Sequence, residues 1–96
     1  MQPNEELAAI RRRIDQIDDQ IVPLLAHRIA LALEASRHKR TAEEVRGCDR
    51  VRQVLDAVAE RARPVHGDVD TIVAIYRFII ERLTALQLHD KGLVES

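Results

Sequence analysis

The sequence contains few of the residues from which disulfides, zinc sites and phosphate-binding loops are built. Cys48 is its only cysteine, which excludes an intramolecular disulfide and a cysteine-rich zinc site. Its three glycines lie far apart, so no glycine-rich phosphate loop is present. The four histidines show no metal-ligand spacing, and no Ser-His-Asp or Cys-His set stands out. The sequence therefore offers neither an evident metal site nor an evident covalent nucleophile.

Long apolar runs and an excess of one charge are also missing. No apolar stretch approaches the ~20 residues of a membrane span, and the start, MQPNEELAAIRRR, lacks the apolar core of a signal peptide. The 15 lysines and arginines nearly balance 16 acids, and a net charge of −1 is unlike that of a typical nucleic-acid binder. We predict a soluble cytoplasmic protein that binds neither membrane nor nucleic acid. The single cysteine is consistent with the reducing conditions of a cytoplasm.

One long stretch with helical periodicity dominates what is present. Between residues 4 and 40 there is no glycine, and apolar residues recur at three- and four-residue spacings. We call these residues the apolar seam: Leu7, Ile10, Ile14, Ile17, Ile21, Leu24, Leu31 and Ala35. The pattern predicts a helix over 4–40, on the order of 50 Å long. Because a chain of 96 residues has too small a core to cover such a helix, a partner chain is implied.

Pro23 lies inside this predicted helix. An interior proline removes one backbone hydrogen bond and tends to kink a helix, yet the heptad spacing continues through it. We predict a bend, with a break into two helices as the alternative. After the basic residues that end the helix, residues 41–47 have the composition of a polar connection.

Two shorter helices are predicted after that connection. Residues 48–63 carry apolar residues at helical spacing and end before a proline, and residues 68–90 carry two apolar stripes behind candidate aspartate caps. We expect the tail, residues 90–96, to fray. No strand pattern or repeat appears, so we predict one all-α domain over residues 1–96 with long, short and long helices.

Arg28 interrupts the apolar seam and is the first candidate functional residue. A charge aimed into a helix–helix core is costly unless a negative group meets it. On one helix Arg28 and Lys39 would lie about 16 Å apart, within reach of one metabolite, whereas Arg11 and Lys39 would be roughly 42 Å apart. Arg11 could therefore join them only from a second copy of the helix. The simpler alternatives are a solvated face for Arg11 and a helix-dipole role for Lys39.

Two more candidates lie on the later helices. Gln87 ends an apolar stripe, where a buried amide must find hydrogen-bond partners, although an edge or capping glutamine fits equally well. Arg50 opens the second helix beside Val51, and a surface arginine is the simpler interpretation there. A set of cations without a nucleophile or a metal suits the binding of an anion and the stabilisation of developing negative charge.

In their order and spacing these residues resemble the all-helical, type II chorismate mutases. The resemblance covers about Glu6 to Gln87 in the segments LAAIRRRIDQIDDQIVPLLAHRIALALEASRHK, RGCDRVRQVL and IYRFIIERLTALQ. Five residues stand at matching positions: Arg11, Arg28, Lys39, Arg50 and Gln87. The resemblance implies an intertwined homodimer of three-helix chains with two shared active sites, and it implies no cofactor.

The resemblance also implies a role for each residue. Arg28 and the partner subunit's Arg11 would bind the two carboxylates of a small dicarboxylate substrate, with Arg50 lining the pocket. Lys39 and Gln87 would donate hydrogen bonds to the ether oxygen of the enolpyruvyl group. That oxygen gains negative charge as its bond to the ring breaks, so fixed donors stabilise the transition state more than the ground state. The implied reaction is the rearrangement of chorismate to prephenate.

Three positions depart from the usual pattern of that family. Gly47 and Val51 stand where typical members have acids that would meet the ring hydroxyl, and Leu83 replaces a small hydroxyl residue. Relatives with an arginine-valine pair include isochorismate-pyruvate lyases and 4-amino-4-deoxychorismate mutases, so both activities are alternatives. An alternative of another class is a non-enzymatic helical dimer whose basic groups bind a partner.

Overall fold

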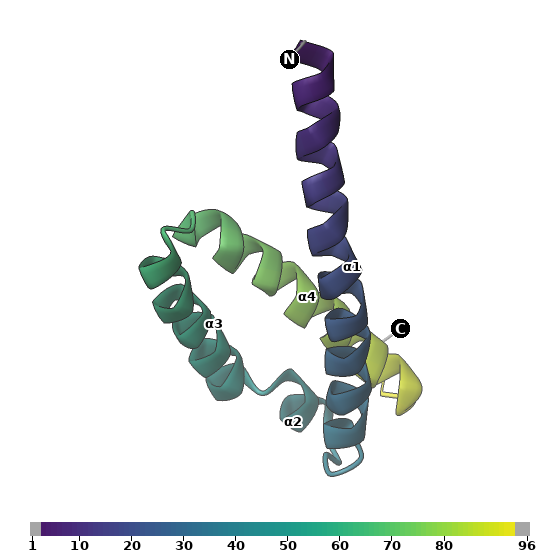
Figure 1. The fold of residues 1–96 in the computed structure, drawn as a ribbon. Coiled ribbons are helices and arrows are strands. Elements are labelled where there is room, and N and C mark those ends of the chain that lie inside the picture. Colours follow the sequence, from purple (N-terminus) through teal and green to yellow (C-terminus); the bar gives the residue numbers. More distant parts are fainter. Residues whose placement is uncertain (1–2, 94–96) are drawn as a thin grey trace. The chain divides into compact units, whose positions relative to one another are not determined.

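The structure, a computed structural model, describes residues 3–93, and its regular elements in this range are all helical (Figure 1). In chain order they are α1 (Pro3–Ser36), α2 (Ala42–Arg46), α3 (Cys48–Ala62), the 3₁₀ helix η1 (Arg63–Val65) and α4 (Val69–Asp90). The predicted all-α class, with long, short and long main helices, is confirmed. No described helix is both long and apolar enough to cross a membrane. The chain divides into two compact units, Met1–Ala32 and Leu33–Ser96, which are described separately.

Helix α1 is 34 residues long and carries the apolar seam on its surface. Glu5 and Glu6 lie in its first turn, where negative charge interacts favourably with the helix dipole. The helix continues through Pro23, so the alternative of a break into two helices is wrong. The isoleucines and leucines of the seam are at least 43% exposed in the single chain. So large an exposed apolar stripe is typical of a surface that another chain covers.

The end of α1 differs from the prediction. The helix ends at Ser36 rather than at residue 40, because three successive i→i−3 hydrogen bonds tighten the chain after it. The backbone N–H groups of Arg37, His38 and Lys39 donate to carbonyls three residues earlier, at 3.0–3.1 Å. Lys39 therefore lies in the turn after α1. The distance predicted between Arg28 and Lys39 assumed that both residues lie on one helix, so it does not apply.

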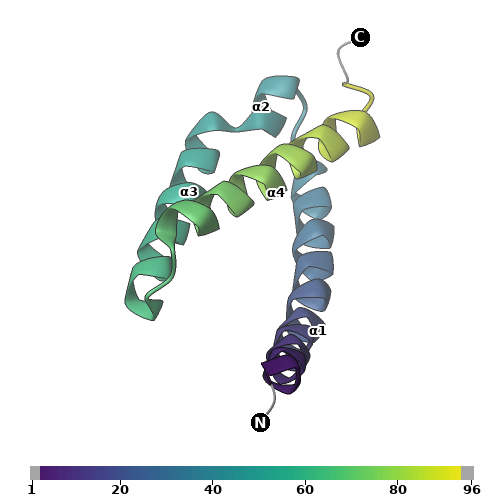
Figure 2. The same ribbon diagram turned by 90° about the horizontal axis from the view of Figure 1, so that it is seen from above.

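The predicted polar connection contains a short helix, α2. Thr41 caps it, because the Thr41 Oγ1 atom accepts a hydrogen bond from the Glu44 N–H at 3.1 Å. Val45 is 4% exposed and anchors α2 in the core of the second unit. Gly47 then adopts a left-handed conformation, with φ of 47°, which ends α2 and turns the chain into α3 (Figure 2).

Helices α3 and α4 form a hairpin, and α4 packs against both α3 and α2 (Figure 1). Helix α3 ends one residue before the predicted limit and passes into η1, whereas α4 begins one residue after its predicted start. Asp68 caps α4 by accepting a hydrogen bond from the Thr71 N–H, which lowers the pKa of the Asp68 carboxyl below its ordinary value of 3.8. The buried apolar residues of this unit are Val45, Leu55, Val58, Ala62 and Leu83.

Candidate active site

Lys39 and Gln87 are in direct contact. The Lys39 Nζ atom donates a hydrogen bond to the Gln87 Oε1 atom at 3.2 Å, across 48 residues of sequence. Gln87 is only 5% exposed, and Lys39 is half-buried. An ammonium group can only donate, so the oxygen end of the amide faces Lys39 and the NH₂ end retains two donors. Both side chains can thus present N–H donors to one small region.

Helix α4 fixes the position of Gln87. Leu83 lies one turn earlier on the same face of α4, and it is buried with 6% of its surface exposed. Helix α4 packs against α2 and α3, and Leu83 and Gln87 are its buried residues, so this face of α4 lies in the core of the unit. The sequence predicted that an amide at this position would need a hydrogen-bond partner, and Lys39 is that partner.

Four residues close a circuit of hydrogen bonds around this contact. The Ser36 carbonyl accepts from the Lys39 N–H at 3.0 Å and from the Lys91 Nζ atom at 2.9 Å. The Lys91 N–H donates to the Gln87 carbonyl at 3.0 Å, and the Lys39–Gln87 side-chain bond completes the circuit. We call these residues, Ser36, Lys39, Gln87 and Lys91, the hydrogen-bonded ring. Ser36 is 2% exposed, so the ring is anchored in the interior.

Backbone hydrogen bonds close the C-terminal end of α4 as far as residue 93. Gly92 has φ of 67°, its N–H donates to the His89 carbonyl at 3.1 Å, and the Leu93 N–H donates to the Leu88 carbonyl at 2.8 Å. This pair of bonds is a Schellman motif. Residues 91–93 thus close the end of α4 with backbone hydrogen bonds, the fraying expected of the tail stays a prediction, and residues 94–96 lie outside the described range.

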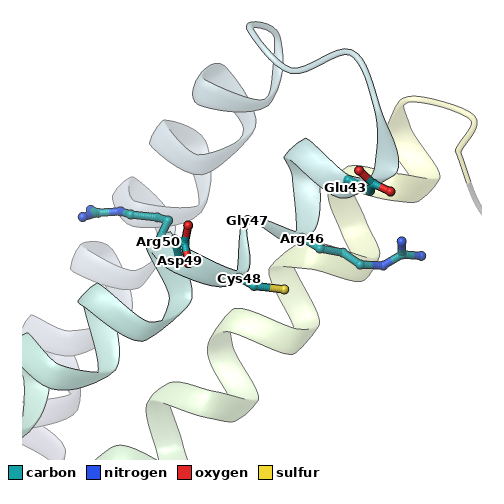
Figure 3. Close-up of a pocket in the computed structure, with 6 residues that line it drawn as sticks. All are labelled: Glu43, Arg46, Gly47, Cys48, Asp49 and Arg50. Carbon is teal, nitrogen blue, oxygen red and sulfur yellow. The ribbon is translucent and has the colours of Figure 1, made fainter.

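Arg50 and Val51 lie in the first turn of α3. Arg50 is exposed, whereas Val51 is half-buried and its N–H donates to the Gly47 carbonyl at 2.9 Å. An open pocket of about 440 Å³ lies at the α2–α3 junction, lined by Glu43, Arg46, Gly47, Cys48, Asp49 and Arg50. Figure 3 shows Arg50 pointing away from Arg46 and Cys48. The pocket therefore does not gather its cations around one point.

The remaining predicted residues, Arg11 and Arg28, belong to the first unit. Both are on α1, where Arg11 is exposed and Arg28 is half-buried. Lys39, Arg50, Val51, Leu83 and Gln87 belong to the second unit. Among the described residues no three histidine, cysteine, aspartate or glutamate side chains lie close enough together to hold a metal ion.

Comparison with known proteins shows that this chain is similar in sequence to one family. The sequence profile of chorismate mutase type II matches residues 10–88. A chorismate mutase of Methanocaldococcus jannaschii is 30% identical over 84 residues, which cover 86% of this chain and 85% of that protein.

Two bifunctional chorismate mutase/prephenate dehydratases are similar as well. That of Escherichia coli K12 is 32% identical over 82 residues, and that of Aquifex aeolicus is 32% identical over 87 residues. These matches cover 84% and 86% of this chain but only 21% and 24% of the two relatives. The chain thus spans between a fifth and a quarter of the length of these bifunctional proteins.

Proposed function

Because this chain belongs to the chorismate mutase type II family, we propose that it catalyses the rearrangement of chorismate to prephenate. The observation that carries the proposal is the contact between Lys39 and Gln87, the two residues that the resemblance pairs at the ether oxygen. They lie 48 residues apart in sequence and have no other reason from local structure to meet. Their contact supports a common target for their donors.

The proposed mechanism uses donors and needs no transfer of a proton. In the substrate the bond between the ether oxygen and the ring breaks while a carbon–carbon bond forms between the enolpyruvyl group and the ring. The ether oxygen gains negative charge in the transition state, and N–H donors of Lys39 and Gln87 stabilise that charge. Gln87 is buried and Lys39 is half-buried, which strengthens the effect because fewer waters screen the charge.

Substrate binding is assigned to the arginines. Arg28 and the partner subunit's Arg11 bind the two carboxylates, and Arg50 contributes to the same site. Held in this way, the enolpyruvyl side chain stays over the ring, so the entropy of orienting it is lost on binding rather than in the reaction. Val51 and Leu83 line the apolar part of the site.

The proposal includes a homodimer. The exposed apolar seam of α1 supports it, because a second copy of the same helix supplies a matching apolar stripe. A dimer also gives each site an Arg11 from the other chain. The cytoplasmic location inferred from the sequence stays a prediction.

The test is an assay of the purified full chain with chorismate, in which substrate and prephenate are separated by chromatography. We expect conversion well above the uncatalysed rate, lowered about 10²-fold or more in Lys39→Ala and retained in Arg61→Ala, which removes an exposed charge from α3. Isochorismate and 4-amino-4-deoxychorismate are assayed in parallel, so the alternative activities are measured in the same experiment. A folded protein that does not accelerate the chorismate reaction would overturn the proposal.

A further inference from the structure

We propose that Lys91 is a positioning residue that holds Lys39 and Gln87 in the geometry needed for catalysis, an inference that rests on the proposed function. Lys91 itself does not touch the reacting atoms. It acts through two bonds of the hydrogen-bonded ring, one from its side chain and one from its backbone.

The side chain of Lys91 fixes the turn that carries Lys39. Its Nζ atom donates to the Ser36 carbonyl at 2.9 Å, where the last turn of α1 ends. The same carbonyl accepts the Lys39 N–H at 3.0 Å, so one oxygen joins the Lys91 ammonium to the Lys39 backbone. A cation at the C-terminal carbonyls of a helix also interacts favourably with the helix dipole. Because Ser36 is 2% exposed, water competes little for this oxygen.

The backbone of Lys91 fixes the other half of the pair. Its N–H donates to the Gln87 carbonyl at 3.0 Å, and the Schellman motif at Gly92 and Leu93 holds the chain at that point. The backbone of Lys91 is therefore bound to Gln87, and its side chain is bound to the turn that carries Lys39. A shift of the Lys91 side chain would alter the distance between Lys39 and Gln87.

The choice of lysine at this position is itself informative. The chain has 15 lysines and arginines, and only two of them, Lys39 and Lys91, are lysines. Both lysines belong to the hydrogen-bonded ring. A single ammonium on a long stem can approach one carbonyl closely, whereas a planar guanidinium requires a wider site.

The fold does not depend on the Lys91 ammonium. Without it the Ser36 carbonyl still accepts the Lys39 N–H, so no buried acceptor is orphaned. The backbone bonds that end α4 are also unaffected. Replacement of the ammonium should therefore disturb the position of Lys39 more than the stability of the chain.

The kinetic test uses Lys91→Met, which keeps the length of the side chain and removes its donor. We expect kcat to fall about 10- to 100-fold, the range for a small misplacement of catalytic groups, with a much smaller change in KM. Lys91→Arg should restore part of the loss. The matched control is Arg61→Met, which removes a basic residue from the last turn of α3 outside the ring and should leave kcat unchanged.

A double-mutant cycle separates positioning from a general structural effect. In the Lys39→Ala background, Lys91→Met should cost little further activity, because the group that Lys91 positions is already gone. Equal losses of kcat in both backgrounds would overturn the inference. Should Lys91→Met fail to fold by circular dichroism, Lys91→Gln carries the same test.

A second readout does not depend on the reaction. Protein labelled with ¹³C-lysine has two side-chain Cε signals, one from each lysine. In Lys91→Met the remaining signal, that of Lys39, should shift, and in Arg61→Met both should stay. An unmoved Lys39 signal would overturn the inference. Absence of chorismate conversion by the unsubstituted chain would instead overturn the proposed function, and the Lys39 signal would still decide whether Lys91 positions Lys39.

Discussion

The Lys39 Nζ atom lies 3.2 Å from the Gln87 Oε1 atom, so the turn after α1 and the end of α4 meet through two polar side chains. Gln87 is buried and lies on helix α4, whereas Lys39 lies in the short turn after α1. The contact holds the flexible ammonium against the fixed amide before any substrate arrives. Donors arranged in advance need little reorganisation during a reaction, which is the main source of electrostatic catalysis.

Loss of either donor should slow the chemical step. Lys39→Ala is expected to lower kcat about 10²-fold or more, the range for deletion of one donor to a developing oxyanion, and Gln87→Ala should act in the same way. Steady-state kinetics on chorismate measure both effects, with Arg61→Ala as the control. If both substitutions change only KM, the roles assigned to Lys39 and Gln87 are wrong.

Mixing two inactive variants should restore activity if the sites are shared between chains. In a heterodimer of Arg11→Ala and Lys39→Ala, one site carries both lesions and the other carries neither. We therefore expect partial recovery after subunit exchange, measured as chorismate conversion by the mixture. Native mass spectrometry provides the control for exchange, and no recovery despite proven exchange would refute the shared site.

The type and order of the helices could be predicted because apolar periodicity determines which faces are buried. Helix α4 was located to within one residue, since Asp68 caps it and its apolar stripe is long. The end of α1 could not be predicted in this way. No glycine or proline marks Ser36, and the turn after it is secured by Lys91, which lies 55 residues further on. Long-range contacts of this kind leave no local signal.

The candidate site was predicted only in part for the same reason. Lys39 and Gln87 could be named from the family resemblance, but Ser36 and Lys91 were missed. A signal for the Schellman motif at the end of α4 was present, because Gly92 followed by Leu93 after a helix matches its sequence pattern. Ser36 acts through its backbone carbonyl, and such a role is independent of side-chain type. The hydrogen-bonded ring could therefore be recognised only in three dimensions.

Gly47 should be required for the junction of α2 and α3. Its φ of 47° lies in the left-handed region, and an added Cβ would approach the Glu44 carbonyl oxygen at 3.4 Å. Gly47→Ala is expected to reduce the free energy of unfolding by about 1–2 kcal/mol, and Gly47→Asn by less, because asparagine tolerates this conformation better. Urea denaturation measures both, and equal stability of all three proteins would contradict the prediction.

Asp68 should make stability depend on acid pH. Its pKa is lowered in the folded chain by the Thr71 N–H, so its contribution is present above the unfolded pKa and is lost as the pH falls through the folded value. Asp68→Asn retains a capping side chain that does not titrate. The melting temperature of the unsubstituted chain should therefore fall relative to that of Asp68→Asn below about pH 4. A constant difference at all pH values would contradict this.

Acids near the α2–α3 junction bear on which ring substituent the site accepts. The Glu44 carboxylate accepts hydrogen bonds from the Arg40 N–H and the Thr41 hydroxyl, at 3.3 and 3.5 Å. Asp49 pairs with Arg52 at 3.7 Å, and both side chains are largely exposed. All of these contacts join residues three or four apart in sequence, so they belong to the local structure of the α2–α3 junction and do not support pairing with an amino substituent.

Val51 should limit recognition of the ring hydroxyl of chorismate. An apolar wall gains little from a hydroxyl, so it distinguishes only weakly between a substrate with the hydroxyl and an analogue without it. A site that hydrogen-bonds the hydroxyl discriminates strongly between the two. Val51→Glu should therefore raise kcat/KM for chorismate relative to an analogue that lacks the hydroxyl, by about 1–3 kcal/mol in selectivity. The half-buried position of Val51 in the first turn of α3 suits this change, because the new acid remains partly shielded from water.

The left-handed conformation of Gly47 makes a substitution at residue 51 a cleaner test than one at residue 47. Gly47→Asp would add the second acid typical of the family, but it would also place a Cβ on a left-handed residue, so any loss of activity could reflect strain. Val51→Glu alone avoids that difficulty, and Val51→Gln is the matched control, since it supplies a polar group of equal size without the charge. Melting curves establish that each variant is folded. Unchanged selectivity in folded Val51→Glu would mean that the hydroxyl is recognised elsewhere in the site.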